Sequence, residues 1–83
     1  MMENLVITDK NQQPSLNHAQ EFLGGYVERM EMPNGDVLLM DEEGRLKNLP
    51  FNADIFVTYG VGVLGKVIII KESARTYNEH GWG

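Results

Sequence analysis

The chain of 83 residues contains no cysteine. Without thiols it cannot form a disulfide framework, a thiolate zinc site or a cysteine nucleophile, and it suits a reducing cytoplasm, where we expect the protein to act. Long apolar runs are missing too. No stretch reaches the roughly 18–20 residues of a membrane-spanning helix, and the first residues lack the basic and apolar regions of a signal peptide. These absences predict a soluble protein with no membrane contact.

Basic residues are scarce, with 7 lysines and arginines against 12 acidic residues and a formal charge of −5. Phosphate backbones would be repelled unless the basic side chains gathered on one face, so the composition disfavours nucleic-acid binding. Mimicry of nucleic acid is disfavoured as well, because the charges are interspersed and 42% of the residues are hydrophobic. A chain of this length predicts one domain, 1–83, that buries only about 60% of the surface its unfolded form exposes, so partner chains would help to stabilise it.

The first part of the chain predicts a strand and a helix. Apolar and β-branched residues at 3–8 indicate the strand. A helix is expected at about 15–23, because Ser15 can cap its start and Gly24 can end it. The apolar residues at helical spacing are Leu16, Ala19 and Leu23. A helix this short must pack its apolar side on a sheet.

A β-hairpin is the strongest local signal in the sequence. Asn34 and Gly35 favour a type I′ turn, because both tolerate positive φ, and they should join antiparallel strands 26–32 and 36–41. The second strand is apolar on both faces, which indicates a central strand covered on both sides. We expect the helix to cover one side and another subunit to cover the other.

Further strands are expected after this hairpin. Gly44 can provide a second reversal that brings 45–50 back as a third strand, and the segments 52–60 and 65–72 are rich in β-branched residues. The predicted fold is therefore α+β, with a mostly antiparallel sheet of about five or six strands and one short helix.

The ordered core is expected at about 3–72, followed by a loose C-terminal extension at 73–83. Two aromatic side chains in this extension, Tyr77 and Trp82, are costly to leave in water. They indicate either docking onto a neighbouring subunit or simple disorder.

The segment "GVGVLGKV" raises the question of a phosphate-binding loop. Gly60, Gly62 and Gly65 fit the dinucleotide fingerprint, and Gly60, Gly65 and Lys66 fit the NTPase loop. Both motifs require a helix after the loop, whereas a β-branched run that predicts a strand follows Lys66, and Val67 lacks the hydroxyl that would bind magnesium. The favoured interpretation is a bend between two strands, with Gly65 at positive φ. An anion-binding nest of backbone amides near Lys66 is the alternative.

Few side chains indicate catalysis or metal binding. Glu28 falls among apolar neighbours in its strand and could act as a general acid or base, although a paired carboxylate or a subunit contact is favoured. His18 and His80 have no acidic residues at metal-ligand spacing, and the acidic run 41–43 lacks the alternating ligands of a calcium loop. We therefore expect no metal and no cofactor.

Three segments together resemble a known family. They are "FLGGYVE", "DVLLMDEEGRLKNLPFN" and "GKVIII", and their order from Leu16 to Glu72 resembles a family of small uncharacterised proteins, encoded largely by bacteriophages and bacteria and classed as a domain of unknown function. The resemblance implies a phage-encoded protein in the host cytoplasm, and it brings no settled activity or catalytic residues. The residues that match the family pattern are Gly24, Gly25, Tyr26, Glu28, Glu43, Gly44, Leu46, Leu49, Pro50 and Asn52.

The sequence favours a non-enzymatic binding or regulatory module that acts as a homo-oligomer. Its partner would be a host protein or a small anionic ligand such as a nucleotide signal, held at an interface lined by the glycine segment. The candidate ligand-binding residues are Tyr26, Glu28, Asn52, Gly60, Gly62, Gly65 and Lys66. The alternative is a structural protein-contact subunit that uses the apolar face of 30–40 and the aromatic tail. A small enzyme that uses Glu28 and Tyr26 as acid and base is less favoured.

Overall fold

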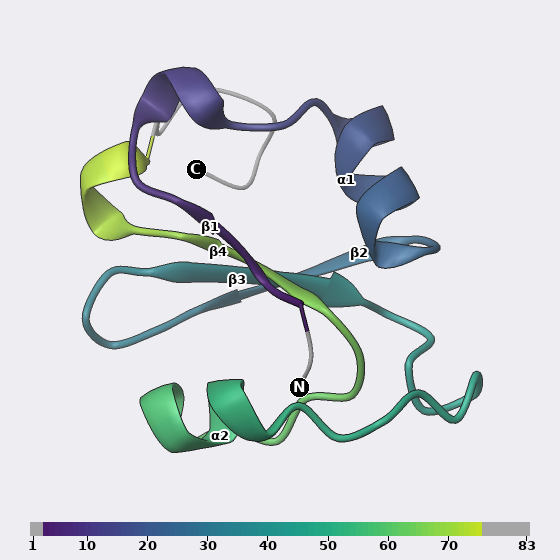
Figure 1. Cartoon of the computed structure of the whole chain (residues 1–83). Coiled ribbons are helices and arrows are strands. Elements are labelled where there is room, and N and C mark those ends of the chain that lie inside the picture. Colours follow the sequence, from purple (N-terminus) through teal and green to yellow (C-terminus); the bar gives the residue numbers. More distant parts are fainter. Residues whose placement is uncertain (1–2, 76–83) are drawn as a thin grey trace.

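Two α-helices lie on opposite faces of a four-stranded sheet (Figure 1). This arrangement comes from a computed structural model that describes residues 3–75. The strands are β1 (Leu5–Ile7), β2 (Val27–Glu31), β3 (Val37–Asp41) and β4 (Val67–Ile70), and the helices are α1 (Leu16–Leu23) and α2 (Ala53–Tyr59), with short 3-10 turns η1 (Lys10–Gln12) and η2 (Glu72–Ala74). Among these described residues, no helix has the length and apolar character needed to cross a membrane.

The sheet is mixed, with the strand order β1-β4-β3-β2. β4 pairs parallel with β1 and antiparallel with β3, and β3 pairs antiparallel with β2. The α+β class is confirmed, but the expected five or six strands and single helix are wrong, since the sheet has four strands and α-helices cover it on both sides. The parallel pair joins the first and last strands of residues 3–75, which run in the same direction.

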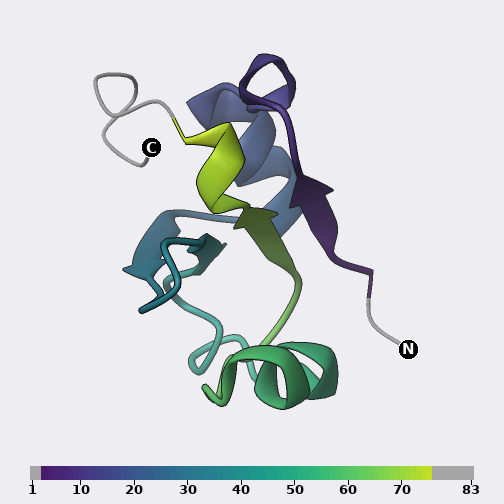
Figure 2. The ribbon, with the colours of Figure 1, turned by 90° about the vertical axis from the view of Figure 1, so that its left-hand side faces the viewer.

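The two central strands are buried on both faces, and their side chains alternate between two apolar clusters. Ile68 and Ile70 pack on the α1 side with Ala19 and Leu23, so these two residues of the predicted apolar side face the sheet, whereas Leu16 is 48% exposed. Val67 and Ile69 pack on the opposite side with Ile55 of α2. The end-on view in Figure 2 shows α1 and α2 separated by the sheet. The segment after Lys66 is thus a strand, as predicted, and no helix follows the glycine segment.

The segment 52–60, predicted as a strand, is helical instead. Asn52 caps the amino end of α2, where its side chain accepts a hydrogen bond from the N–H of Ile55, and Gly60 ends the helix at φ 74°. The helix covers the face of β3 on which another subunit was expected. That expectation was wrong because the chain supplies its own second layer.

The segment 45–50, predicted as a third strand of the meander, forms compact turns. The N–H of Lys47 donates to the carbonyl of Glu43 (2.9 Å) and that of Leu49 to the carbonyl of Gly44 (3.0 Å). Asn48 adopts the left-handed conformation at φ 57°, which interrupts an extended chain. These local bonds replace the pairing that a further strand would need.

The predicted hairpin and helix are confirmed, with a different turn in the hairpin. The N–H of Gly35 donates to the carbonyl of Met32 (2.9 Å), and Gly35 has φ 95° whereas Asn34 has no positive φ. This is a three-residue connection rather than the two-residue type I′ turn.

In α1 the Ser15 hydroxyl accepts a hydrogen bond from the N–H of His18 (3.2 Å), as its predicted cap role requires.

The predicted C-terminal extension lies mostly beyond the described residues. Its first residues belong to η2, in which Ala74 is buried. The proposed docking of Tyr77 and Trp82 falls outside the part of the chain that the structure describes.

Candidate functional site

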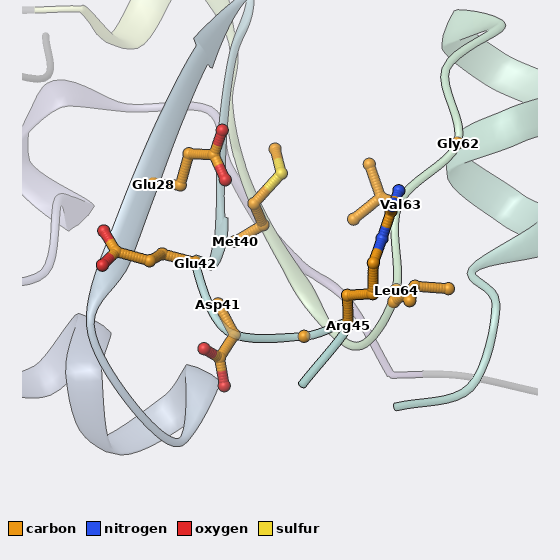
Figure 3. A pocket seen from close by; sticks show the side chains of 9 residues that line it. Glu28, Met40, Asp41, Glu42, Arg45, Gly62, Val63 and Leu64 are labelled. Atoms are coloured by element: carbon orange, nitrogen blue, oxygen red, sulfur yellow. The ribbon is translucent and has the colours of Figure 1, made fainter. Parts of the chain in front are cut away.

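A pocket of about 160 Å³ opens at the edge of the sheet beside β2 (Figure 3). Glu28 and Met40 line its sheet side, and Val63 lines the opposite side. In the view of Figure 3, the side chain of Arg45 lies across the pocket from Glu28. Glu42, Asp41, Gly44, Gly62 and Leu64 complete the lining. We call this cavity the Glu28 pocket.

The strand register explains why Glu28 lies here. Glu28 is opposite Met40 in the β2–β3 pair, so both side chains point to the α2 face of the sheet. Met40 is buried, whereas Glu28 is exposed because β2 is the edge strand. An acidic group and an apolar floor therefore meet at one edge of the fold.

The opposite wall is held by backbone contacts of the segment 61–64. The carbonyl of Val63 accepts a hydrogen bond from the N–H of Asn52 (2.9 Å), and Leu64 forms an isolated bridge with Phe51. Gly44 is buried against this segment, and a Cβ on Gly44 would lie 3.0 Å from the carbonyl oxygen of Leu64. The absence of a side chain at Gly44 thus lets the turn carrying Arg45 approach the wall.

The charged side chains that line the pocket differ in their burial and in their hydrogen-bond partners. The Asp41 carboxylate points away from Met40 (Figure 3), accepts hydrogen bonds from Lys47 Nζ and the N–H of Glu43 (both 2.8 Å), and is buried. Burial alone would raise the pKa of Asp41, but these bonds outweigh it and lower the pKa. Within residues 3–75, by contrast, Glu28 and Arg45 form no ion pair, so they remain available to a ligand.

The structure brings Glu28 and Gly62 together in this pocket and places the other predicted site residues elsewhere. Tyr26 precedes β2 and is 65% exposed. Lys66 Nζ lies 4.5 Å from the ring centroid of Phe22, in a cation–π contact near the end of α1. These side chains do not form one polar cluster.

Asn52 is completely buried, and its polar atoms are bonded inside the fold. Its Oδ1 caps α2 by accepting from the N–H of Ile55 (3.2 Å), while Nδ2 donates to Asn4 Oδ1 (2.8 Å) and to the carbonyl of Gly65 (2.9 Å). The side chain therefore joins α2, the N-terminal segment and the start of β4.

The glycine segment also uses its backbone internally. The N–H of Gly60 donates to the carbonyl of Phe56, and that of Gly65 to the carbonyl of Pro50 (both 2.8 Å). Gly65 has the predicted positive φ, at 92°, directly before Lys66 and the last strand. The amides of Gly60 and Gly65 are thus committed to the fold instead of being open to an anion.

A second polar cluster, centred on Asp36, was missed in the sequence. Its buried Oδ2 accepts hydrogen bonds from Tyr59 Oη and Lys71 Nζ (both 2.8 Å) and from Asn34 Nδ2 (3.1 Å), and Oδ1 accepts from the N–H of Glu72 (2.9 Å). Burial would raise the pKa of Asp36, yet these bonds lower it to about 2.

The partners of Asp36 keep their ordinary charge states. Burial and the bond to Asp36 raise the pKa of Tyr59, and the same carboxylate raises the pKa of Lys71. The lysine stays protonated and the phenol stays neutral at pH 7, which suits a structural link better than proton transfer. Among residues 3–75, no group of three or more acidic or histidine side chains has the arrangement to hold a metal ion.

The fold and the pocket define a small α+β domain with an open, mixed-polarity cavity at one sheet edge. The chain belongs to the DUF3846 family, a domain of unknown function, which matches residues 2–79. This match confirms that the family is one without a known function, as the sequence resemblance implied. No curated protein and no solved structure matches the chain.

Proposed function

We propose that this domain is a non-enzymatic binding module that contacts another protein by receiving one of its lysine or arginine side chains in the Glu28 pocket. The observation that supports this proposal is the combination of a small pocket volume, an apolar floor at Met40 and the carboxylate of Glu28 at the rim. Of the two partners that the sequence left open, a host protein and a small anionic ligand, this proposal takes the protein.

The size of the pocket favours a single side chain. Sites for small molecules and cofactors usually measure about 300–1,000 Å³, whereas this pocket measures about 160 Å³. A nucleotide would therefore lie mostly outside it. A long, narrow side chain fits better, because it is much smaller than a base with its sugar and phosphates.

The lining matches the two ends of a basic side chain. The aliphatic stem of lysine or arginine can lie along Met40 and Val63, while its charged head reaches the carboxylate of Glu28. Arg45 on the other wall can bond to a carbonyl or an acidic neighbour of the inserted residue. The formal charge of −5 also favours a basic partner surface.

The alternatives have less support. Anion capture by the glycine segment would need open amides, but those of Gly60 and Gly65 are bonded internally. Acid–base catalysis would need a titratable group moved toward neutral pH, whereas the shifts in the Asp36 cluster stabilise the ordinary charge states.

The proposal is tested by amide NMR titration of the protein with a short blocked peptide that carries one lysine. We expect shifts at Met40, Arg45 and Val63 that saturate at about millimolar peptide, as a single-side-chain contact implies. The same peptide with acetyllysine should have no effect, because it lacks the charge. Glu28→Lys should abolish the shifts, and Glu21→Lys, which changes an exposed carboxylate of α1, should leave them unchanged.

A titration with adenosine monophosphate separates the rival ligands. Shifts from this anion at residues 60–66, with none from the lysine peptide, would replace the proposal by anion binding. Lysine-peptide shifts that persist in Glu28→Lys would also overturn it.

A further inference from the structure

We propose that two copies of this chain pair through the outer edge of β2, with which no other strand of residues 3–75 pairs, antiparallel and with Met30 on the two-fold axis, to form one continuous sheet. The inference rests on the backbone and charges of β2 and is independent of the ligand of the Glu28 pocket. β2 is the longer of the two edge strands, since it spans Val27–Glu31 whereas β1 spans Leu5–Ile7.

The hydrogen bonds to β3 identify which residues of β2 face the open edge. The carbonyl of Tyr26 accepts from the N–H of Glu42 (2.9 Å), and the N–H of Met32 donates to the carbonyl of Asp36 (2.8 Å). In an antiparallel ladder, backbone groups point alternately to one neighbour and the other. The outward N–H and C=O groups are therefore those of Val27, Arg29 and Glu31.

A second copy of β2 can use these groups in few registers. With Met30 opposite Met30 of the second copy, Arg29 lies opposite Glu31 and Glu31 opposite Arg29, and each such pair can exchange both of its N–H···O bonds. The side chains of Arg29 and Glu31 share one face of the sheet, since their partners Leu39 and Val37 both belong to the α1-side cluster. Opposite charges thus face each other across the axis at about 5 Å between Cβ atoms.

The neighbouring registers are unfavourable. Centring the pair on Arg29 places two guanidinium groups opposite each other, and centring it on Glu31 places two carboxylates opposite each other. Charges on an edge strand usually prevent pairing. Here their order, Arg29 followed two residues later by Glu31, permits one self-complementary register.

The side chains already show that Arg29 and Glu31 attract each other. Arg29 Nη2 lies 3.4 Å from Glu31 Oε1 within one chain, and Arg75 Nη1 lies 3.1 Å from Glu31 Oε2. Glu31 is exposed, and its pKa is lowered, first of all by its hydrogen bond to Arg75. In the dimer the guanidinium of the second copy would join this carboxylate, while Arg75 keeps its place.

The two-fold axis of such a pair is perpendicular to the sheet, so both copies of α2 would lie on the same face. Met30, half-buried beside the α2-side cluster, would meet its counterpart there. Glu28, opposite Met40, also points to that face, so both Glu28 side chains of the dimer would lie on one side of the continuous sheet.

The test measures molar mass by light scattering and sedimentation from about 10 µM to about 1 mM protein. The native chain should be dimeric at the upper concentrations. Arg29→Glu and Glu31→Arg should each weaken dimerisation about tenfold or more, because each variant places like charges in both cross-strand pairs. An equimolar mixture of the two variants should restore a dimer, since every cross-strand pair of the mixed dimer again joins one carboxylate to one guanidinium. Glu21→Arg on α1 should dimerise like the native chain.

Thermal unfolding of each variant shows that it is folded, and hydrogen exchange locates the contact. The amides of Arg29 and Glu31 should exchange more slowly at high than at low protein concentration, whereas those of β3 should not change. A monomer at every concentration, a dimer that persists in both single variants, or a mixture that stays monomeric would each overturn the proposal. None of these results depends on the lysine peptide.

Discussion

The carboxylate of Asp36 joins three parts of the fold, since its Oδ2 lies 2.8 Å from Lys71 Nζ, at the end of β4, and 2.8 Å from Tyr59 Oη, at the end of α2. Asp36 itself follows the hairpin loop and precedes β3. A buried carboxylate with four donors is strongly held, and loss of the charge would leave these donors poorly matched.

Stability should therefore fall in acid partly because of Asp36. Its pKa is about 2 in the folded protein against an ordinary value of 3.8, so the unfolded state binds the proton more tightly. The stabilisation is present above pH 4 and is lost as the pH falls toward 2, and the shift corresponds to about 2 kcal/mol. Urea unfolding between pH 7 and pH 2 measures this loss.

The matched variant is Asp36→Asn. It should be about 2 kcal/mol less stable at pH 7, and its stability should depend less on pH below pH 4 than that of the native chain. Equal pH dependence in both proteins would show that other carboxylates, such as Asp41, cause the acid sensitivity.

Replacement of Asn52 should reveal its role as a structural link. Asn52→Ala removes the cap of α2 and leaves the carbonyl of Gly65 without its side-chain donor, which should cost about 2–3 kcal/mol. Asn52→Asp keeps the cap oxygen but turns a second oxygen toward Gly65 O and Asn4 Oδ1. At pH 7 this variant should be the less stable of the two.

The direction in which the stability of Asn52→Asp changes with pH tests whether its new carboxylate faces acceptor oxygens. A buried carboxylate that faces acceptors has a raised pKa, so the folded Asn52→Asp protein should bind a proton more tightly than the unfolded one. Its stability should rise as the pH falls from 7 toward 4, opposite to the trend expected from Asp36. Denaturant unfolding of both variants at pH 7 and pH 4.5 gives the comparison. If Asn52→Asp lost the same free energy of unfolding at both pH values, the raised pKa of its carboxylate would be contradicted.

Gly24 and Gly65 offer a matched pair of positive-φ positions. Gly24→Ala should cost about 1 kcal/mol, because φ is 94° and the space around a Cβ is open. Gly65→Ala should cost clearly more, since φ is 92° and a Cβ would lie 2.7 Å from Leu49 Cδ1. Thermal unfolding of both variants, each with and without Leu49→Ala, tests this difference. The added Leu49→Ala should partly restore the stability of Gly65→Ala and should not restore that of Gly24→Ala.

Local signals predicted the parts of the fold that depend on neighbouring residues. Ser15 and Gly24 bounded α1 correctly, and the β-branched run after Lys66 forms β4. The hairpin was also found, although the extra loop residue changed its turn. The parallel pairing of β1 with β4 was not predicted, because it joins the two ends of the chain and leaves no local pattern.

The lining of the Glu28 pocket was predicted only in part. Glu28 was selected because of its apolar neighbours, and Gly62 because of its motif, but nothing in the sequence indicated that they share a pocket with Arg45. Their proximity depends on the turns of 45–50 and on α2, and both of these segments were assigned to strands. Asp36 was missed because its partners, Tyr59 and Lys71, are far away in the sequence.

The segment 53–59 shows why composition misled the prediction. Its isoleucine, valine and aromatic residues favour a strand, and seven residues are too few for the period to decide. Caps at Asn52 and Gly60 were the signal for a helix. Neither residue was interpreted as a cap, because Gly60 was assigned to the glycine motif and Asn52 to the candidate ligand site.

Two substitutions in this segment separate a helix from a strand in solution. In a strand Ile55 and Val57 would share a face, whereas in α2 Ile55 is 1% exposed and Val57 is 82% exposed. Ile55→Ala should therefore lower the free energy of unfolding by about 2–4 kcal/mol, because it opens a cavity under the helix. Val57→Ala should change it by less than about 0.5 kcal/mol, since the side chain lies in water and alanine favours a helix. Urea unfolding of both proteins at pH 7 makes the comparison, and similar losses for the two variants would contradict the helical assignment on which both the second layer and the Glu28 pocket depend.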